Sequence, residues 1–384
     1  MPSTSRNAAN SDVAAPWWPT LSELLERVHI VSLATRTQFR GIRTREAALF
    51  EGPNGASEFS PFLEYADGEA AAWLAAAIEY GWGTLPPLRR SRVEVNATVP
   101  AVAAGEVADV LARFEGCTTA KVKVAEKGQS LDDDIARVRA VRELMGDNAL
   151  VRIDANGGWS VDEAERALTA LAEFDLDYAE QPCMSIDELV VVRRRLTITS
   201  GASSTSDTGN SASVSSAASA DRPTPLVRIA ADESVRKASD PLAVARSGAA
   251  DLLIVKAQPL GGITRAIDII AAAGLPAVVS SALDTSVGIG MGLHLAAALP
   301  EASVDSPLGP GVGLAGACGL GTVALLDGDV TNESLLPQHG GITVRRPTLD
   351  PNKLAHNQAT SDRQQWWRDR IRRCYALLVA GATP

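Results

Sequence analysis

The chain has 384 residues, of which 46% are hydrophobic and 21% are charged, a composition typical of a protein that buries a core and not of a disordered chain. Its 36 basic and 46 acidic residues give a formal net charge of −10, which argues against a nucleic-acid-binding surface. No apolar run approaches the roughly 20 residues of a bilayer span, and the N-terminal segment lacks the basic and apolar regions of a secretory signal.

The four cysteines lie far apart and form no CxxC pair, so we expect neither a disulfide framework nor a zinc site. Because the chain has only four histidines, a metal site would have to use carboxylates, which favours a hard cation such as Mg²⁺. These features predict a cytoplasmic globular protein whose partner is a small molecule and neither a nucleic acid nor a membrane.

Between about residues 93 and 300, short apolar runs alternate with helical patterns. The runs that predict β-strands are Val93–Val99, Thr119–Val124, Leu150–Asp154, Leu176–Glu180, Val227–Asp232, Leu252–Lys256 and Ala277–Ser281. Repeated strand-then-helix units of this length predict a parallel sheet, and their number favours an α/β fold of the (β/α)8-barrel type. An open, doubly wound sheet is the alternative.

Several of the intervening helices carry start and stop signals. Three capping boxes are present, which pair Ser130 with Asp133, Ser160 with Glu163, and Ser185 with Glu188. Asp240 followed by Pro241 predicts a further helix start with the proline at the first helical position, and Gly274 predicts a helix end.

Two segments interrupt this alternation. Ser200–Ala220 is a Ser/Ala/Gly/Thr tract that cannot bury enough apolar surface to order itself, so we expect a disordered surface insert over about 199–224. Leu308–Gly321 is rich in glycine and is expected to be a loop.

The tryptophans concentrate near the two ends of the chain. Six of the seven are Trp17, Trp18, Trp73, Trp82, Trp366 and Trp367. Because tryptophan mostly supplies buried contact area, we expect both ends to pack into one smaller α+β capping domain. This predicts a capping domain over residues 1–92, a barrel over 93–330, and a C-terminal segment over 331–384 that packs back on the cap. Two unrelated aromatic patches are the alternative.

Charged residues end many of the predicted strands. They are Lys121 and Lys123, Asp154, Glu180, Asp232 and Lys256. Since side chains alternate faces along a strand, Lys121 and Lys123 share a face. In a barrel, catalytic groups project from the C-terminal ends of the strands.

The intervals between these residues indicate that they meet. Lys123 to Asp154 is 31 residues, Asp154 to Glu180 is 26, and Asp232 to Lys256 is 24, each about one strand–helix unit. Glu180 to Asp232 is 52 residues, and that interval contains the low-complexity tract. Three carboxylates on successive strands would form a hard-cation site flanked by lysines, whereas a set of surface ion pairs is the alternative.

Such a site suits abstraction of a proton α to a carboxylate. A divalent metal can stabilise the enediolate as it forms, and a lysine can act as the base if burial and neighbouring cations lower its pKa. Lys121 and the cation would lower the pKa of Lys123, and Lys256 would face the other side of the planar intermediate.

This pattern of residues resembles the enolase superfamily, specifically its muconate-cycloisomerase-like subgroup, and within it the actinobacterial type of o-succinylbenzoate synthase. The matching stretches include TAKVKVAEKGQSLDDDIARV at 119–138, RIDANGGWS at 152–160, YAEQPC at 178–183, IAADESVRKASDPLAV at 229–244 and VVSSALDTSVGI at 278–289. The resemblance covers nearly the whole chain, except the two loop insertions and an extension before Trp17.

The resemblance implies a role for each matched residue. Asp154, Glu180 and Asp232 would ligate Mg²⁺. Lys123 would remove the α proton and protonate the departing hydroxyl in a syn dehydration, Lys256 would stabilise the enediolate, and Lys121 would contact the substrate carboxylate. Arg152, Asn156, Ser280 and Ser281 are further substrate-side candidates. The implied product is o-succinylbenzoate, on the route to menaquinone.

Several alternatives stay open or are disfavoured. Racemisation of N-acylamino acids or epimerisation of dipeptides would use the same six residues, and Gly41–Thr44 and Glu58–Tyr65 would decide the substrate. A non-catalytic barrel scaffold would be expected to have lost one of the six.

Gly311–Gly316 matches GxGxxG but lacks the strand and helix that a dinucleotide site needs. Gly261–Gly262 is either an anion-binding helix start or a tight turn. Cys183 has no histidine near it in sequence, so we do not expect a thiolate nucleophile.

Overall fold

The structure, a computed structural model, describes residues 18–39, 41–198, 224–236 and 240–381. The chain divides into two compact units. The first comprises the described residues of 1–96, 113–117 and 255–384, and the second those of 97–112 and 118–254. Trp17 and the predicted insert Ser200–Ala220 lie outside the described residues.

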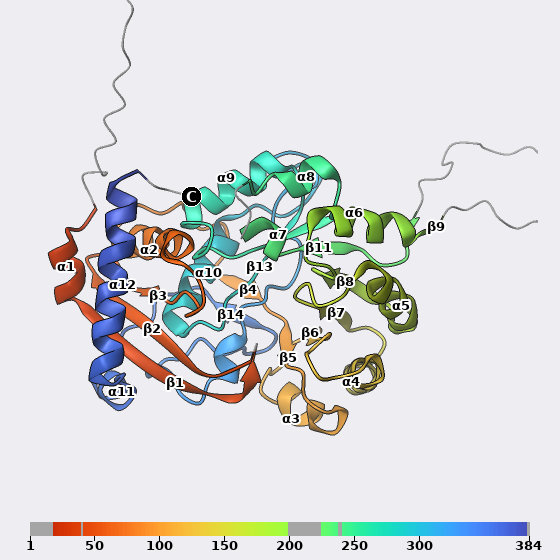
Figure 1. The fold of residues 1–384 in the computed structure, drawn as a ribbon, viewed down its shortest axis with the longest axis horizontal. Helices are drawn as coiled ribbons and strands as arrows, with labels where there is room; N and C mark the ends of the chain where they lie inside the picture. Colours follow the sequence, from red (N-terminus) through yellow and green to blue (C-terminus); the bar gives the residue numbers. More distant parts are fainter. Residues whose placement is uncertain (1–17, 40, 199–223, 237–239, 382–384) are drawn as a thin grey trace, which may run out of the picture. The chain divides into compact units, whose positions relative to one another are not determined.

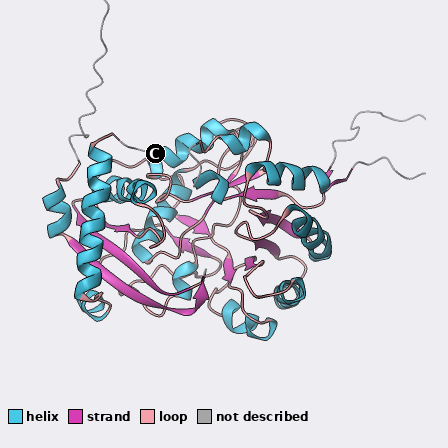
Figure 2. Cartoon of the chain, in the orientation of Figure 1, coloured by secondary structure: helices cyan, strands magenta, loops and turns pink. Residues whose placement is uncertain are grey.

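The first unit contains a three-stranded antiparallel sheet, in the order β1-β2-β3, and several helices (Figures 1 and 2). Its strands are β1 (Val28–Phe39), β2 (Ile42–Gly52), β3 (Gly55–Phe59), β4 (Arg92–Glu94), β13 (Ala277–Val279) and β14 (Gly341–Thr343). Its helices are α1 (Leu21–Glu26), α2 (Asp67–Trp82), α9 (Ile263–Ala273), α10 (Ser286–Ala298), α11 (Pro351–His356) and α12 (Ser361–Val379), with the short 3-10 helix η3 (Thr322–Leu325).

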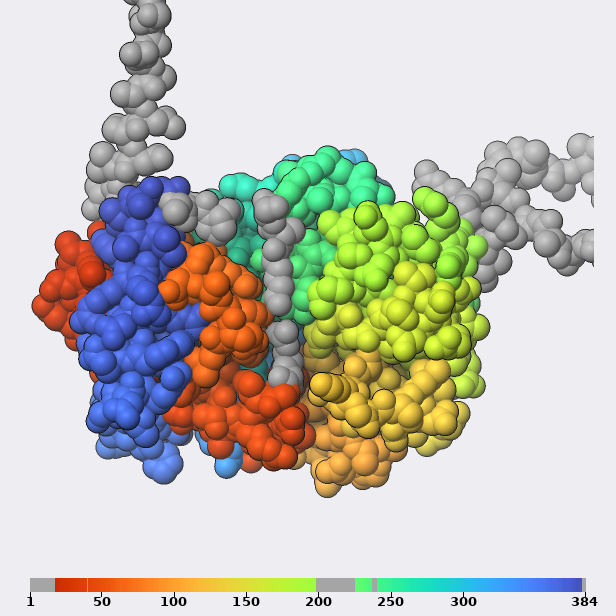
Figure 3. Space-filling view, viewed as in Figure 1, coloured from red at the N-terminus to blue at the C-terminus, as the bar shows by residue number. Residues whose placement is uncertain are grey.

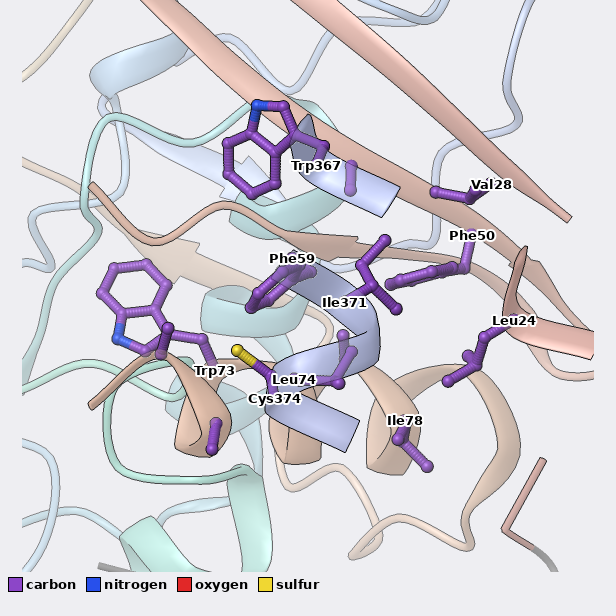
Figure 4. Close-up of a cluster of buried hydrophobic side chains, with 14 of the residues drawn as sticks. Leu24, Val28, Phe50, Phe59, Trp73, Leu74, Ile78, Trp367, Ile371 and Cys374 are labelled. Atoms are coloured by element: carbon purple, nitrogen blue, oxygen red, sulfur yellow. The ribbon is translucent and has the colours of Figure 1, made fainter. Parts of the chain in front are cut away.

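A core of aromatic and aliphatic side chains joins the two ends of the chain in this unit (Figure 4). Trp367 of α12 is fully buried and meets Phe59 of β3 edge-on, with ring centroids 5.6 Å apart. Trp73 of α2 lies in the same core, and Trp18, Trp82 and Trp366 pack against it. Figure 3 shows α12 (blue) and α2 (orange) side by side at the surface. The prediction that the two termini pack together is confirmed.

Polar contacts add to this joining of β2 and α12. The Glu46 carboxylate accepts from the guanidinium of Arg363 at 2.7 and 2.9 Å and from the indole N–H of Trp367 at 2.7 Å. The C-terminal helix is therefore bonded to the N-terminal sheet as well as packed on it.

The second unit alternates parallel strands with helices, and its strands follow the order β12-β11-β8-β7-β6-β5. These strands are β5 (Ala97–Val99), β6 (Thr119–Lys123), β7 (Leu150–Asp154), β8 (Leu176–Glu180), β11 (Ile229–Ala231) and β12 (Leu252–Val255), whose last residue belongs to the first unit. The helices are α3 (Val107–Leu111), α4 (Leu131–Met145), α5 (Val161–Leu171), α6 (Ile186–Arg195), α7 (Glu233–Arg236) and α8 (Ala243–Ser247), with η1 (Ala104–Glu106) and η2 (Ala172–Phe174). In Figure 1, α4, α5 and α6 lie along the outer side of β6, β7 and β8.

The predicted fold class, α/β of the (β/α)8-barrel type with a smaller α+β cap, is confirmed, and among the described residues the main sheet has seven strands. The boundaries placed at 92/93 and 330/331 remain predictions. The strand predicted over Val93–Val99 is wrong as a single element, since β4 pairs antiparallel with β14 and β5 pairs parallel with β6. Between the two strands the chain pairs with Cys318, whose backbone N–H donates to Glu94 O at 2.8 Å and whose carbonyl accepts from Asn96 N at 2.9 Å.

The three predicted capping boxes start α4, α5 and α6, with both reciprocal hydrogen bonds present in each. Gly274 ends α9 with a φ of 66°, as its position predicted. The start predicted at Asp240 and Pro241 is wrong by two residues. Asp240 Oδ1 accepts from Leu242 N at 3.1 Å and so closes a turn, after which α8 begins at Ala243.

Two loops complete the description. The Leu308–Gly321 segment forms single parallel bridges, from Leu314 to Ala277 and from Gly319 to Ser280, so it occupies the position beside β13 where a further strand would lie. The short strands β9 (Thr197–Ile198) and β10 (Thr224–Pro225) pair antiparallel on either side of residues 199–223. Among the described residues, no helix is long and apolar enough to cross a membrane.

Candidate active site

The C-terminal edge of the sheet in the second unit brings together six of the predicted site residues, which are Lys121, Lys123, Asp154, Asn156, Glu180 and Asp232. Lys123 of β6 lies opposite Asp154 of β7 in the parallel register, and Asp154 lies opposite Glu180 of β8. Asp232 follows β11, whose Ala230 is the register partner of Glu180. The carboxylates of Asp154, Glu180 and Asp232 are each at most 2% exposed.

Two lysines pair with the carboxylates of Asp154 and Glu180. The Lys121 Nζ lies 2.8 Å from Glu180 Oε2 and 3.5 Å from Asp154 Oδ2. The Lys123 Nζ lies 2.5 Å from Asp154 Oδ2 and donates to Asn156 Oδ1 at 2.7 Å. Because buried charges are costly unless they are paired, these contacts stabilise the site.

The two lysines differ in their pKa values. Burial acts to lower the pKa of Lys121, but Glu180 and Asp154 outweigh burial and hold that pKa above its ordinary value. For Lys123, burial together with the positive charge of Lys121 outweighs Asp154, so its pKa is below its ordinary value. Although burial acts to raise the pKa of Asp154, Lys123 and Lys121 keep it low, so this carboxylate stays ionised. The edge thus carries one lysine whose charged form is favoured beside one that is easier to deprotonate.

Asp232 has its own partners. Its Oδ1 accepts from Arg236 Nε at 3.0 Å, and Arg236 also pairs with Glu233 at 2.6 Å. The backbone N–H of Asp232 donates to Gln181 Oε1 at 2.9 Å. The Asp232 residue is therefore bonded through both its carboxylate and its backbone N–H.

Asn156 joins Lys123 to this acidic group. It has a positive φ of 48°, its backbone N–H donates to Asp154 Oδ1 at 3.0 Å, and its Nδ2 donates to Glu233 Oε1 at 3.2 Å. Asn156 is therefore well placed to orient Lys123.

Arg152 lies on the same sheet but is largely engaged elsewhere. Its Nε donates to Asp177 Oδ2 at 2.8 Å, and its guanidinium lies 4.7 Å from the ring centroid of Tyr178. A substrate contact by Arg152 stays a prediction.

Three predicted residues, Lys256, Ser280 and Ser281, belong to the first unit. Lys256 follows β12 and is 9% exposed. Ser280, just after β13, is also buried, and its backbone N–H donates to Val255 O at 2.8 Å. The Ser281 hydroxyl donates to Gly319 O at 2.7 Å and lies 2.8 Å from Thr322 Oγ1. It therefore bonds to the end of the Leu308–Gly321 loop and to the start of η3.

A second buried acidic group, which the sequence reasoning missed, surrounds Glu58 in the first unit. Its carboxylate accepts from Ser60 Oγ at 2.6 Å, Thr285 Oγ1 at 2.5 Å and Gly288 N at 3.0 Å. The neighbouring Asp284 carboxylate lies 3.8 Å from the Arg45 guanidinium. The Glu58 side chain is thus bonded inside the unit, although the sequence had suggested Glu58–Tyr65 as a substrate-contacting segment.

The donor chemistry of Asp154, Glu180 and Asp232 fits a hard divalent cation, because all three are carboxylates on adjacent strand ends. Among the described residues, however, no three His, Cys, Asp or Glu side chains are gathered closely enough to hold a metal as they stand. Each of the three acids instead pairs with a cationic side chain.

The structure also decides on the other sequence motifs. The amides at the start of α9, after Gly261–Gly262, are occupied by Glu79 of α2, which accepts from Ile263 N at 2.5 Å and Thr264 N at 3.1 Å. The anion at this helix start is therefore the protein's own.

Burial raises the pKa of Cys183 to about 12, which leaves a neutral thiol and not a nucleophile. The next described element after Gly311–Gly316 is the short η3, so the dinucleotide motif has no helix to open.

Sequence reasoning also missed Gln181, Glu233 and Arg236. Each stands next to or within four residues of a predicted carboxylate, in the AEQP and ADESVR stretches. Proximity in sequence was the signal that could have found them.

Comparisons with known proteins agree with this architecture. The family model described as enolase C-terminal domain-like matches residues 103–346, and the one described as enolase N-terminal domain-like matches residues 30–81. The chain is similar to o-succinylbenzoate synthase of Mycobacterium tuberculosis, with 50% identity over 365 residues that cover 95% of this chain and 98% of the relative. The protein of the same name from Mycobacterium marinum is 49% identical over 94% of this chain and 96% of its own.

Solved structures share the fold at lower identity. A 2-chloromuconate cycloisomerase from Rhodococcus opacus gives a TM-score of 0.64 at 22% identity, covering 87% of this chain and 98% of its own. A dipeptide epimerase from Enterococcus faecalis, solved in complex with Mg and a dipeptide, gives 0.61 at 19% identity, covering 85% and 98%. The chain belongs to the enolase superfamily and, within it, to the family of the o-succinylbenzoate synthases.

Proposed function

We propose that the protein is a lyase that converts 2-succinyl-6-hydroxy-2,4-cyclohexadiene-1-carboxylate to 2-succinylbenzoate, a dehydration in menaquinone biosynthesis. The observation that carries the reaction class is the pair of buried lysines, of which Lys121 stays charged and Lys123 has a lowered pKa, beside Asp154 and Glu180. The choice of substrate is supported by the 50% identity to relatives named o-succinylbenzoate synthase.

Asp154, Glu180 and Asp232 would hold the cation, for which we propose Mg²⁺. A bound divalent cation would supply positive charge to the substrate carboxylate as the α proton leaves. The enolase superfamily uses a lysine or histidine base together with Mg²⁺. Treatment with a chelator is expected to abolish product formation, and added Mg²⁺ is expected to restore it.

Lys123 is the proposed base, because its neutral form is made accessible by burial and by Lys121. It takes the α proton from the ring carbon, and the electron pair of that C–H bond forms the enediolate. The C–O bond to the hydroxyl then breaks, the ring becomes aromatic, and the same proton leaves with the hydroxide as water. One base on one face therefore serves both steps.

The remaining residues would position or stabilise. Lys121 would bind the substrate carboxylate, and Lys256 would stabilise the negative charge without moving a proton. Asn156 accepts from the Lys123 ammonium at 2.7 Å and would orient it. Further contacts to the substrate would come from Arg152, Ser280 and Ser281. We also propose a cytoplasmic location, which is supported by the four cysteines being free thiols.

The test separates proton abstraction from loss of water. The substrate is incubated with each variant in deuterated buffer, and α-proton exchange is followed by NMR beside product formation. Lys123→Ala is expected to abolish exchange, with a loss of at least about 10²- to 10⁴-fold for a general base. Lys256→Arg should retain exchange while forming little product.

The alternative, racemisation of N-acylamino acids or epimerisation of dipeptides, predicts another pattern. Each lysine would then serve one stereoisomer, so each single variant would still exchange the proton of one enantiomer. Stereospecific exchange that survives in Lys123→Ala would contradict the dehydratase roles and favour the racemase.

A further inference from the structure

Gln181 follows directly after Glu180 and holds an unusual backbone conformation. Its φ is 41°, in the left-handed region that residues other than glycine adopt only rarely. Its backbone N–H donates to Ala230 O of β11 at 2.8 Å, and its carbonyl accepts from Gly157 N at 2.7 Å. The residue therefore bonds to the chain on both sides of β8.

The side chain of Gln181 is completely buried and makes four bonds shorter than 3.3 Å. Its Oε1 accepts from the backbone N–H groups of Asp232 at 2.9 Å and Ser234 at 3.2 Å. Its Nε2 donates to Ser234 Oγ at 2.6 Å and to Cys183 O at 2.9 Å. A primary amide offers an acceptor for the first two groups and two N–H donors for the last two.

We propose that Gln181 is a positioning residue for the candidate cation site, fixing the backbone of Asp232 relative to that of Glu180. The inference rests on the proposed function, in which these two carboxylates are ligands. The ladder between β11 and β8 ends where Ala230 lies opposite Glu180, and Asp232 lies two residues beyond that pair. Gln181 links the two acids, because its backbone continues from Glu180 while its side chain bonds to Asp232.

A purely structural role would affect folding, whereas a positioning role affects cation affinity in the folded protein. Partners behind metal ligands typically change affinity by about 10- to 100-fold when they are removed. Gln181→Met keeps the length of the side chain but removes all four bonds, and Gln181→Asn keeps the amide but draws it back by one methylene. Both variants leave the three carboxylates unchanged.

The experiment titrates the full-length protein with MnCl₂ and measures free Mn²⁺ by electron paramagnetic resonance. We expect Gln181→Met to bind Mn²⁺ about 10- to 100-fold more weakly than the unsubstituted protein, and Gln181→Asn to fall between them. The matched control is Leu168→Ala. It shortens a fully buried side chain of α5 and so leaves a cavity in the core. That control should lower Tm and leave Mn²⁺ affinity unchanged.

The outcomes distinguish two failures. If the unsubstituted protein binds no Mn²⁺, the cation site of the proposed function is wrong. If it binds Mn²⁺ and the folded Gln181 variants bind equally well, the positioning role is wrong. Should neither variant fold, amide hydrogen exchange of the unsubstituted, metal-free protein decides. The Asp232 and Ser234 amides donate to Gln181, so they should exchange slowly. Rapid exchange of these two amides would overturn the inference.

Discussion

The buried carboxyl of Glu58 is expected to make the protein less stable as the pH rises. Burial, with the neighbouring Asp284 carboxylate, raises the pKa of Glu58 from an ordinary value of 4.5 to about 7, despite the bonds from Ser60 and Thr285 and the charge of Arg45. Between these two values the unfolded chain has released the proton that the folded protein keeps. The unfolded state then binds fewer protons, so the free energy of unfolding falls with increasing pH.

The magnitude follows from the difference of about 2.5 units between the two pKa values, which corresponds to about 3 kcal/mol in total. About 2 kcal/mol of this is lost between roughly pH 5.5 and pH 8.5, since the unfolded chain is already largely ionised at the lower value. Unfolding entropy of about 2.1 cal/mol/K per residue gives about 0.8 kcal/mol/K for the chain, so this loss lowers Tm by about 2 to 3 °C.

Differential scanning calorimetry of the protein and of Glu58→Gln across this pH range measures the effect. Glutamine cannot ionise, so the variant should lack this part of the pH dependence whatever its own Tm. Glu143→Gln, which replaces an exposed carboxyl of α4, is the control and should follow the unsubstituted protein. If Glu58→Gln shows the same fall in Tm with pH as the unsubstituted protein, the raised pKa is refuted.

Two further predictions concern stability. Glu79→Ala removes the carboxylate that caps α9, which has no capping side chain of its own, so we expect a loss of about 1–2 kcal/mol and a fall of about 1–2 °C in Tm. Gly288→Ala would place a Cβ 2.6 Å from Asp284 Cβ and 2.9 Å from Gln258 Nε2, so it should lower Tm. Gly68→Ala, in the first turn of α2 with nothing within 4 Å, should leave Tm unchanged or raise it; a similar fall in both glycine variants would contradict the steric argument.

Local signals were enough to predict much of the second unit. Leu150–Asp154 and Leu176–Glu180 are strands with the predicted bounds, and the three capping boxes start helices. These features depend on residues within a few positions of each other. The spacing of one strand–helix unit also predicted correctly that Lys123, Asp154 and Glu180 lie at one edge of a sheet.

Features that depend on distant partners were not predictable in this way. The break within Val93–Val99 lies where the backbone pairs with Cys318, more than 200 residues away. The α9 start is capped by Glu79, 184 residues from Ile263. Gln181 likewise meets Asp232 only because β8 and β11 are neighbours in the sheet. A single sequence contains no local signal for such pairings.

The contact of α12 with the N-terminal sheet has a consequence for the order in which the protein is made. Trp367 and Ile371 fill the space between β3 and α2, yet they are made only after the long stretch of chain that separates them from these two elements. The apolar side chains of Phe59 and Trp73 therefore stay uncovered while the nearly 300 intervening residues are synthesised. This core cannot be completed until α12 has been made, so loss of that helix would leave the apolar side chains of β3 and α2 exposed to aggregation.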